Sequence, residues 1–239
     1  MKVAAIICAR MGSKRFPGKV MEKIAGVPML EHICDRAKKL YGLHDVIIAT
    51  TTRAEDDRLK DCNYPVFRGP VENVISRITK AVYYDYDFIY RMTGDNPVVD
   101  PDVYMAAFNP HADYTTIAGM PDGTQPEFIS VEALQRLRNR IGDDPYFQEH
   151  PTQGFYKYIL GFNMELRHYK SFEHHRLTVD YPEDLEMFNR MYADISLDST
   201  LPEIIQYLDA NPRVARINAH LKSEHRIGDL SQIPPDREG

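Results

Sequence analysis

The N-terminal part of the chain alternates short apolar runs with segments whose apolar residues recur at helical spacing. Residues 3–9 form a continuous apolar run, which is typical of a strand buried on both faces of a parallel sheet. Strands and helices that alternate in this way predict βαβ units, and therefore an α/β fold with a mostly parallel sheet covered by helices. The predicted strands are 3–9, 45–51, 64–69 and 88–93, and the predicted helices between them are 28–40, 53–60 and 74–83.

The regular pattern is lost over residues 110–165. Proline and glycine punctuate this part, in which one helix, at 131–139, is clear. Because no low-complexity linker sets it apart, we expect an irregular, substrate-facing insertion over the sheet, within a single domain of residues 1–239. After the insertion, the pattern predicts a strand at 174–180 and helices from Pro182, at 201–208 and at 212–221.

Cationic side chains are concentrated directly after the first predicted strand. They are Arg10, Lys14, Arg15 and Lys19. Like charges packed this closely repel one another unless solvent or an anion separates them, so the segment is either a solvated loop or an anion-binding cradle. Gly12 and Ser13 favour the cradle, because they allow backbone N–H groups to approach phosphate oxygens. The spacing matches neither the P-loop nor the G-x-G-x-x-G dinucleotide fingerprint.

Composition narrows the range of ligands. The formal net charge of −6 argues against a broad nucleic-acid-binding face and favours a small anionic ligand at the basic loop. The three cysteines, Cys8, Cys34 and Cys62, match neither a disulfide framework nor a zinc site by spacing. The N-terminal apolar run is too short to span a bilayer. We therefore expect a cytoplasmic protein without a nucleic-acid or membrane partner.

Polar motifs follow several predicted strands at their carboxyl ends, where ligands gather in an open parallel sheet. The basic loop follows the first strand, and Arg68 and Gly69 follow the third. Asp95 follows the fourth strand, and Asp180 ends the strand at 174–180. Cations together with two isolated acids suit a nucleoside triphosphate with Mg²⁺, because Mg²⁺ takes oxygen ligands from carboxylates and phosphates. Asp95 and Asp180 are therefore the predicted metal ligands.

Structural roles alone can also account for these motifs. The basic loop is adequate as a solvated turn, and Gly-Asp-Asn-Pro around Asp95 is adequate as a tight turn. Asp180 is placed to act as the N-cap of the helix that follows it. Both readings stay open at this point.

Two further motifs are not expected to form metal sites. Asp85-Tyr86-Asp87 has the D-x-D pattern of many glycosyltransferase metal sites, but it precedes its strand and is predicted to be a polar turn at the opposite edge. His174 and His175 are adjacent, so on an extended chain their rings point to opposite faces, and joint metal ligation is not expected. Contact with solvent or with substrate is expected for them instead.

The chain resembles the cytidylyltransferase family that includes the CMP-sugar-acid synthetases in the stretches "ARMGSKRFPGKV", "TGDNPVVDP" and "RLTVDYPEDLE". "VFRGPVENVISR" resembles a further block of the spore-coat-polysaccharide SpsF-like branch, to which the chain is most similar. The resemblance implies a Rossmann-like three-layer α/β/α sandwich of the nucleotide-diphospho-sugar transferase type, and a homodimer. It also implies that the basic loop binds the phosphates of CTP and that Asp95 and Asp180 hold Mg²⁺.

The residues and the resemblance together predict a set of functional side chains. The predicted catalytic residues are Arg15, Lys19, Asp95 and Asp180. The predicted nucleotide-binding residues are Ala9, Arg10, Met11, Gly12, Ser13, Lys14, Arg15, Lys19, Arg68, Gly69, Thr93 and Gly94. The predicted substrate-binding residues are Gln125, Glu127, Glu149 and His150. The SpsF-like branch generally reads Gly-Leu-Asp-Val-Glu where this chain has "GTQPEF", so the identity of the acceptor stays open.

We predict an enzyme that transfers CMP from CTP to a small anionic acceptor and releases pyrophosphate, for surface polysaccharide or related biosynthesis. The acceptor is a sugar acid, a phosphate or a phosphonate. The sequence offers no convincing general base, and an acceptor that is already an anion does not need one. The alternatives are a nucleotidyltransferase that uses another nucleoside triphosphate on a sugar phosphate, and a nucleotide-sugar-binding, glycosyltransferase-like protein.

Overall fold

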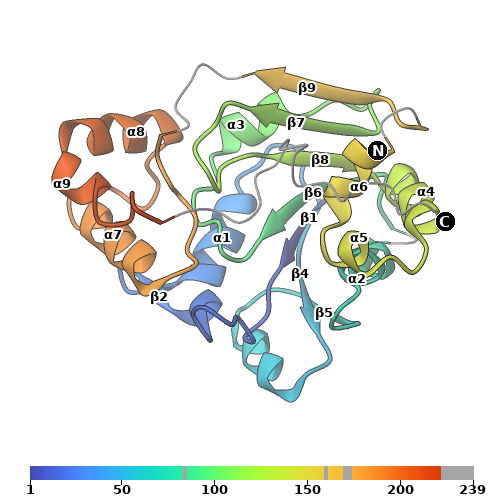
Figure 1. The fold of residues 1–239 in the computed structure, drawn as a ribbon, viewed down its shortest axis with the longest axis horizontal. Helices are drawn as coiled ribbons and strands as arrows, with labels where there is room; N and C mark the ends of the chain where they lie inside the picture. The colour runs from blue at the N-terminus through green and yellow to red at the C-terminus, as the bar shows by residue number, and fades with distance from the viewer. Residues whose placement is uncertain (83–84, 159–160, 169–173, 222–239) are drawn as a thin grey trace.

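The computed structural model describes residues 1–82, 85–158, 161–168 and 174–221. Its main sheet has seven strands in the order β5-β4-β1-β6-β8-β7-β9 (Figure 1). One half of this sheet is parallel throughout, and the four strands predicted there are confirmed. These strands are β1 (Val3–Cys8), β4 (Asp45–Thr51), β5 (Val66–Gly69) and β6 (Phe88–Thr93). Because β1 and β6 are parallel neighbours, their carboxyl ends meet at one edge.

The other half of the sheet comes from residues 114–168, which include most of the region predicted as an insertion. It holds β7 (Tyr114–Ala118), β8 (Glu127–Ser130) and β9 (Met164–His168). β8 runs antiparallel to both β6 and β7, and β9 runs parallel to β7. The expected irregular insertion over the sheet is therefore wrong, because this region extends the sheet itself. Its strands are only four or five residues long, which is too short for a clear alternating pattern.

Helices cover both faces of the sheet (Figure 1). One layer contains α1 (Met29–Ala37), α7 (Pro182–Tyr192) and α8 (Leu201–Ala210), and the other contains α2 (Val74–Val82), α4 (Val131–Ile141) and α6 (Pro151–Lys157). Side chains of β1 alternate between the two cores, with Ala5 and Ile7 in the first and Ala4 and Ile6 in the second. The predicted three-layer α/β/α arrangement with a mostly parallel sheet is confirmed.

Shorter elements complete the described part of the fold. They are the hairpin strands β2 (Lys23–Ile24) and β3 (Val27–Pro28), the helices α3 (Pro101–Ala106), α5 (Pro145–Glu149) and α9 (Pro212–Ala215), and the 3-10 helices η1 (Lys19–Met21) and η2 (Ala54–Asp61). The charged helix predicted at 53–60 is thus a 3-10 helix, and the helix predicted at 212–221 ends at Ala215. Within the described residues, no helix combines the length and the apolar character needed to cross a membrane.

The strand predicted at 174–180 is wrong. This segment makes one isolated bridge, between Asp122 and Arg176. The N–H of Leu177 donates to the carbonyl of Asp122, and the N–H of Val179 donates to the carbonyl of Asp95, at 2.7 and 2.8 Å. Leu177 and Val179 are fully buried apolar residues two positions apart, with polar residues between and beside them, and this sequence alternation explains the strand-like pattern. The segment lies against the loops that follow β6 and β7, and this places Asp180 beside Asp95.

Candidate active site

The candidate site lies at the carboxyl ends of β1 and β6, where the chain leaves both strands as loops. The N–H of Gly94 donates to the carbonyl of Cys8 at 2.8 Å, which continues the pairing one residue past the strands. A Cβ on Gly94 would lie 2.8 Å from the Cβ of Ala9. Glycine at this position therefore lets the loop carrying Asp95 approach the loop carrying the cations.

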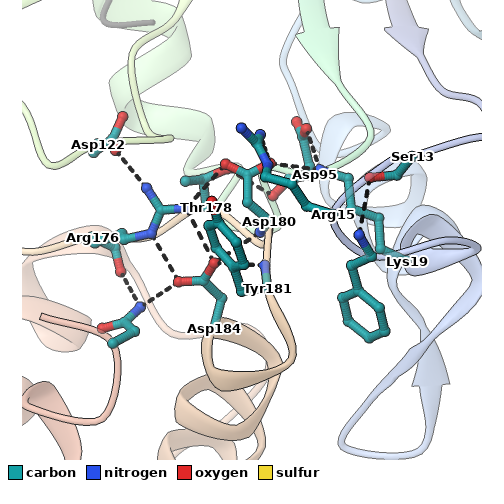
Figure 2. Close-up of polar contacts among 12 residues, drawn as sticks. Ser13, Arg15, Lys19, Asp95, Asp122, Arg176, Thr178, Asp180, Tyr181 and Asp184 are labelled. Atoms are coloured by element: carbon teal, nitrogen blue, oxygen red, sulfur yellow. Dashed lines mark hydrogen bonds and ion pairs between the residues drawn. The ribbon is translucent and has the colours of Figure 1, made fainter. Parts of the chain in front are cut away.

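Lys19 joins the two acids that the sequence predicted to meet. Its Nζ lies 2.8 Å from Oδ2 of Asp95 and 2.8 Å from Oδ1 of Asp180 (Figure 2). Arg15 also donates to Oδ1 of Asp180, at 2.7 Å. The predicted convergence of the basic loop with the two distant acids is present in the structure.

Burial and charge act against each other at this cluster. Burial alone would lower the pKa of Lys19, but Asp95 and Asp180 outweigh it, so the pKa of Lys19 is raised. Burial alone would raise the pKa of Asp180, but Lys19 and Arg15 lower it to about 2. Lys19 is therefore protonated and Asp180 ionised at neutral pH, and each charge stabilises the other.

Arg176 and Asp184 form a second layer behind Asp180 that the sequence reading missed. Arg176 donates to Oδ2 of Asp180 at 3.0 Å, to Oδ1 of Asp184 at 2.9 Å and to Oδ2 of Asp122 at 3.3 Å (Figure 2). The spacing Arg-x-x-x-Asp-x-x-x-Asp in "RLTVDYPED" could have indicated this pairing. Arg176 fixes the orientation of the Asp180 carboxylate from the side opposite Lys19.

The helix-capping role considered for Asp180 belongs to Asp184. Oδ2 of Asp184 accepts from the N–H groups of Asp180 and Tyr181, at 2.8 and 3.0 Å. The carboxylate of Asp180 instead accepts hydrogen bonds from Arg15, Lys19 and Arg176. The N–H groups just before α7 are thus bonded by a residue inside the helix. The Asp180 carboxylate is therefore free of a capping role and faces the cations of the site.

A cavity of about 520 Å³ lies between the basic loop and the end of β6. Among the residues predicted to bind nucleotide, those that line it are Ala9, Arg10, Ser13, Lys14, Arg15, Lys19, Thr93 and Gly94. Cys8, Val74, Arg77 and Arg91 also line it. The cavity is large enough for a nucleotide-sized ligand, and its cations come mostly from one loop.

Four residues predicted for nucleotide binding do not line this cavity. Met11 is buried, with its N–H donating to Asp56 at 2.6 Å, and a Cβ on Gly12 would lie 2.7 Å from Oε1 of Glu55. Arg68 donates to the carbonyl of Thr51 at 3.0 Å and pairs with Asp57, and Gly69 packs against Arg77. Met11 and Gly12 contact residues of η2, and the structure does not bring Arg68 and Gly69 to the cavity, since the Arg68 side chain is turned toward η2.

A second cavity, of about 250 Å³, continues from the first toward β8 and α6. Gln125, Glu127 and His150, which were predicted to bind the acceptor, line it. Glu149 lines the first cavity instead, where Arg10 lies 3.4 Å from it. The residues shared by the two cavities are Arg15, Arg91, Thr93, Asp95, His150 and Asp180. The two acids therefore stand at the junction of the cavities.

Charges in the second cavity are paired within the protein. Glu127 is only 2% exposed, forms an ion pair with Arg91 and accepts from the hydroxyl of Tyr114 at 2.9 Å. Within the described residues, Nε of Arg91 and Oε1 of Gln153 are buried without a hydrogen-bond partner. A buried polar atom without a hydrogen-bond partner lowers the stability of the fold. Both atoms could therefore form a favourable hydrogen bond with a polar ligand in this cavity. Neither Arg91 nor Gln153 was predicted, because each is a lone polar residue in an otherwise ordinary element.

The D-x-D motif lies elsewhere, as predicted. The hydroxyl of Tyr86 donates to Asp45 at 2.8 Å, and Asp87 accepts from the N–H of Lys2 at 2.7 Å. These contacts lie at the amino end of β6, and none of the three motif residues lines either cavity.

The paired acids fit a hard divalent cation. Both carboxylate oxygens lie within 2.8 Å of the same ammonium nitrogen, so they are separated by no more than twice this distance. Oxygen donors of this kind, supplemented by phosphate, are what Mg²⁺ prefers. The ammonium of Lys19 already places one cationic group between the two acids, and Lys19 also lines the first cavity.

Sequence and structure comparisons agree on one group of proteins. A family profile described as cytidylyltransferase matches residues 4–195. The spore coat polysaccharide biosynthesis protein SpsF of Bacillus subtilis is 31% identical over 228 residues, which cover 88% of this chain and 95% of that protein. A 3-deoxy-manno-octulosonate cytidylyltransferase of Geobacter metallireducens is 32% identical over 170 residues, which cover 65% of this chain and 64% of that one.

Solved structures confirm the predicted fold type. A cytidylyltransferase from Leptospira borgpetersenii matches with a TM-score of 0.84 and 26% identity, covering 94% of this chain and 100% of that chain. The fold is that of the nucleotide-diphospho-sugar transferases.

Proposed function

This chain belongs to the cytidylyltransferase family, in its SpsF-like branch, and from that premise we propose that it transfers CMP from CTP to a sugar acid. The predicted enzyme class, a CTP-dependent nucleotidyltransferase, is confirmed by the family match. The observation that carries the proposal is the position of Lys19 between Asp95 and Asp180, at the junction of two cavities. The first cavity is the proposed site of CTP, and the second is the proposed site of the acceptor.

The basic loop supports triphosphate binding in the first cavity. Arg10, Lys14, Arg15 and Lys19 line it together with Ser13. We assign Arg15 and Lys19 to neutralise the leaving pyrophosphate, and Arg10 or Lys14 to contact the α-phosphate. Such a transfer depends on positioning and charge neutralisation more than on covalent help from the protein.

Asp95 and Asp180 are the residues that would hold Mg²⁺, which when bound offsets phosphate charge and helps to fix the geometry of the triphosphate. With Mg²⁺ bound, Asp180 would give up its contacts with Arg15 and Lys19, and these two cations would be available to phosphate oxygens. Arg176 keeps Asp180 in place from behind, at 3.0 Å. No charge would be left unpaired, because the two acids would pair with Mg²⁺ and the two cations with phosphate oxygens.

The acceptor oxygen attacks the α-phosphorus in line, a new O–P bond forms, and the bond to the pyrophosphate breaks. A hydroxyl acceptor also loses a proton, and we assign His150 to take it, because His150 lines both cavities. Gln125, Gln153 and Arg91 offer hydrogen bonds to the rest of the acceptor. A sugar acid is favoured because the lining includes the cations Arg15 and Arg91 beside amide side chains, and because the Geobacter metallireducens relative is a 3-deoxy-manno-octulosonate cytidylyltransferase.

A screen of acceptors and nucleotides tests this proposal. Purified protein with Mg²⁺ is incubated with each of the four nucleoside triphosphates and a panel of sugar acids, sugar phosphates and phosphonates. We expect pyrophosphate release with CTP and one or more sugar acids, with a product mass equal to the acceptor plus CMP. Turnover of another nucleotide on a sugar phosphate would contradict the proposal, as would nucleotide binding without pyrophosphate release.

The family resemblance also implies a homodimer, and the composition implies a cytoplasmic location. Both stay predictions, which light scattering and cell fractionation can test.

A further inference from the structure

Three side chains with metal-binding chemistry meet outside both cavities: His174, His175 and Asp209. The two histidines directly precede Arg176, and Asp209 lies in the last turn of α8. None of the three lines the candidate active site. The cluster therefore needs an explanation that is separate from nucleotidyl transfer.

The expectation that the two rings point to opposite faces is wrong. His174 lies in a turn, where the alternation of an extended strand does not hold. The ring centroids are 4.1 Å apart, and both Nε2 atoms approach Oδ1 of Asp209, at 3.2 Å from His174 and 2.9 Å from His175. Two imidazoles and one carboxylate thus converge on one point.

These separations fit the edges of a metal tetrahedron. Zinc is bound by imidazole nitrogen and carboxylate oxygen at roughly 2.0–2.1 Å, so two ligand atoms on a tetrahedral ion lie about 3.3 Å apart. The contacts of 2.9 and 3.2 Å are close to this value, and all three ligand atoms lie within 4.8 Å of one another. Small side-chain adjustments would place an ion among them.

The exposure of the three side chains also suits an ion that enters from solvent. The side chains of His174 and Asp209 are 59% and 52% exposed, whereas that of His175 is 7% exposed. A buried anchor and two accessible ligands leave the fourth position of the ion open to water.

We propose that His174, His175 and Asp209 bind one zinc-class divalent transition-metal ion. Imidazole ligands favour zinc and its neighbours over Mg²⁺, which prefers oxygen. The ion would tie α8 to the start of the segment that carries Arg176. Asn218, which follows α9, contacts the same segment, donating to the carbonyl of Arg176 at 3.1 Å and to Oδ1 of Asp184 in α7 at 2.9 Å.

Titration of the full chain with Co²⁺ and Zn²⁺, in excess Mg²⁺, tests the proposal. We expect one equivalent of Co²⁺ to give the visible absorption of a low-coordinate nitrogen and oxygen site, and Zn²⁺ to displace it and raise Tm. His174→Ala and Asp209→Asn should each weaken binding by at least the roughly 10–100-fold that loss of an outer-shell partner costs. Both side chains are largely exposed, so both variants should keep the far-UV circular dichroism of the parent.

Two controls separate this site from others. His111→Ala removes an exposed imidazole elsewhere and should leave the Co²⁺ band unchanged. Asp95→Asn should also keep the band, because Asp95 is not one of the three ligands. Equal Co²⁺ affinity in the parent, His174→Ala and Asp209→Asn would overturn the proposal. Absence of any Co²⁺ band in the parent would show a hydrogen-bonded cluster only and would overturn it as well.

Discussion

The two cavities that meet at Asp95 and Asp180 are built in different ways. The cations of the first come mainly from one loop, at Arg10, Lys14, Arg15 and Lys19. The second is lined by a few residues each from β6, the loop before β8, β8 itself, α6 and the segment before α7, and its Glu127 is paired with Arg91. The charged loop is recognisable in the sequence, and it suits the triphosphate of CTP, which would be the same for every acceptor. A lining assembled from many segments can be altered by single substitutions, so it suits the acceptor, the substrate that would differ between related enzymes.

The largest expected effect is the loss of turnover when the junction of the cavities is changed. Asp95→Asn removes a proposed metal ligand while keeping its shape, so we expect pyrophosphate release to fall by more than roughly 100-fold, beyond the cost of losing an outer-shell partner. The Asp95 side chain is 30% exposed, so the fold should be nearly unchanged. Steady-state rates with CTP and the acceptor found in the screen measure the effect.

Asp122→Asn is the matched control, because Asp122 is a carboxylate of the second cavity that also contacts Arg176. It should keep Mn²⁺ binding in the presence of CTP, as followed by electron paramagnetic resonance, whereas Asp95→Asn should lose it. If Asp95→Asn turned over at the wild-type rate, Asp95 would not be a metal ligand.

Lys19→Met should cost about 3 kcal/mol of unfolding free energy, because it leaves two acids without their shared buried partner. The Lys19 side chain is 8% exposed, so solvent screens the contact little. Mg²⁺ should restore part of the loss and raise Tm more in this variant than in the parent, since the ion takes the place of the ammonium. Lys19→Arg keeps the charge and should lose less. A Mg²⁺ effect of equal size in the parent and in Lys19→Met would contradict the shared site.

Acid should destabilise the junction through Asp180. The pKa of Asp180 is held at about 2, chiefly by Lys19 and Arg15 against the opposing effect of burial. Its folded pKa is depressed, so its contribution is full above the ordinary value of about 4 and is lost as pH falls toward 2. The contribution is about 2 kcal/mol. Urea unfolding at about pH 5 and about pH 3 should show a smaller pH effect in Asp180→Asn than in the parent, and parallel losses would count against the ion pairs.

The smallest expected effects separate the two cavities from each other. Arg10→Ala should raise the KM for CTP about tenfold and leave that for the acceptor nearly unchanged, because Arg10 lines only the first cavity. Gln125→Ala should do the reverse, because Gln125 lines only the second. If both variants raise the same KM, the assignment of the two cavities is wrong.

The sequence predicted the half of the fold in which long, fully buried strands alternate with helices. It also predicted that the basic loop, Asp95 and Asp180 meet, because the carboxyl ends of parallel strands share an edge. The position of Asp180 came out correctly for an incorrect reason. The predicted strand before it is an irregular segment that hydrogen-bonds to the loops holding Asp95 and Asp122.

Other features could not be read from local pattern. The short strands β7, β8 and β9 gain their stability from neighbours far along the chain, so their own residues carry little signal. Arg91 and Gln153 become functional candidates only because tertiary packing buries them beside a cavity with an atom unpaired. Arg68 is the opposite case: it was predicted as a site residue because it ends a strand, but its side chain pairs with the nearby Asp57 instead of facing the cavity.

A crystal structure of the protein with CTP and Mn²⁺ tests the central claim most directly. We predict an anomalous Mn²⁺ peak between the carboxylates of Asp95 and Asp180, with the triphosphate against residues 10–19 and the ammonium of Lys19 turned to a phosphate oxygen. A Mn²⁺ peak away from these two carboxylates, or a triphosphate bound outside the basic loop, would contradict the account.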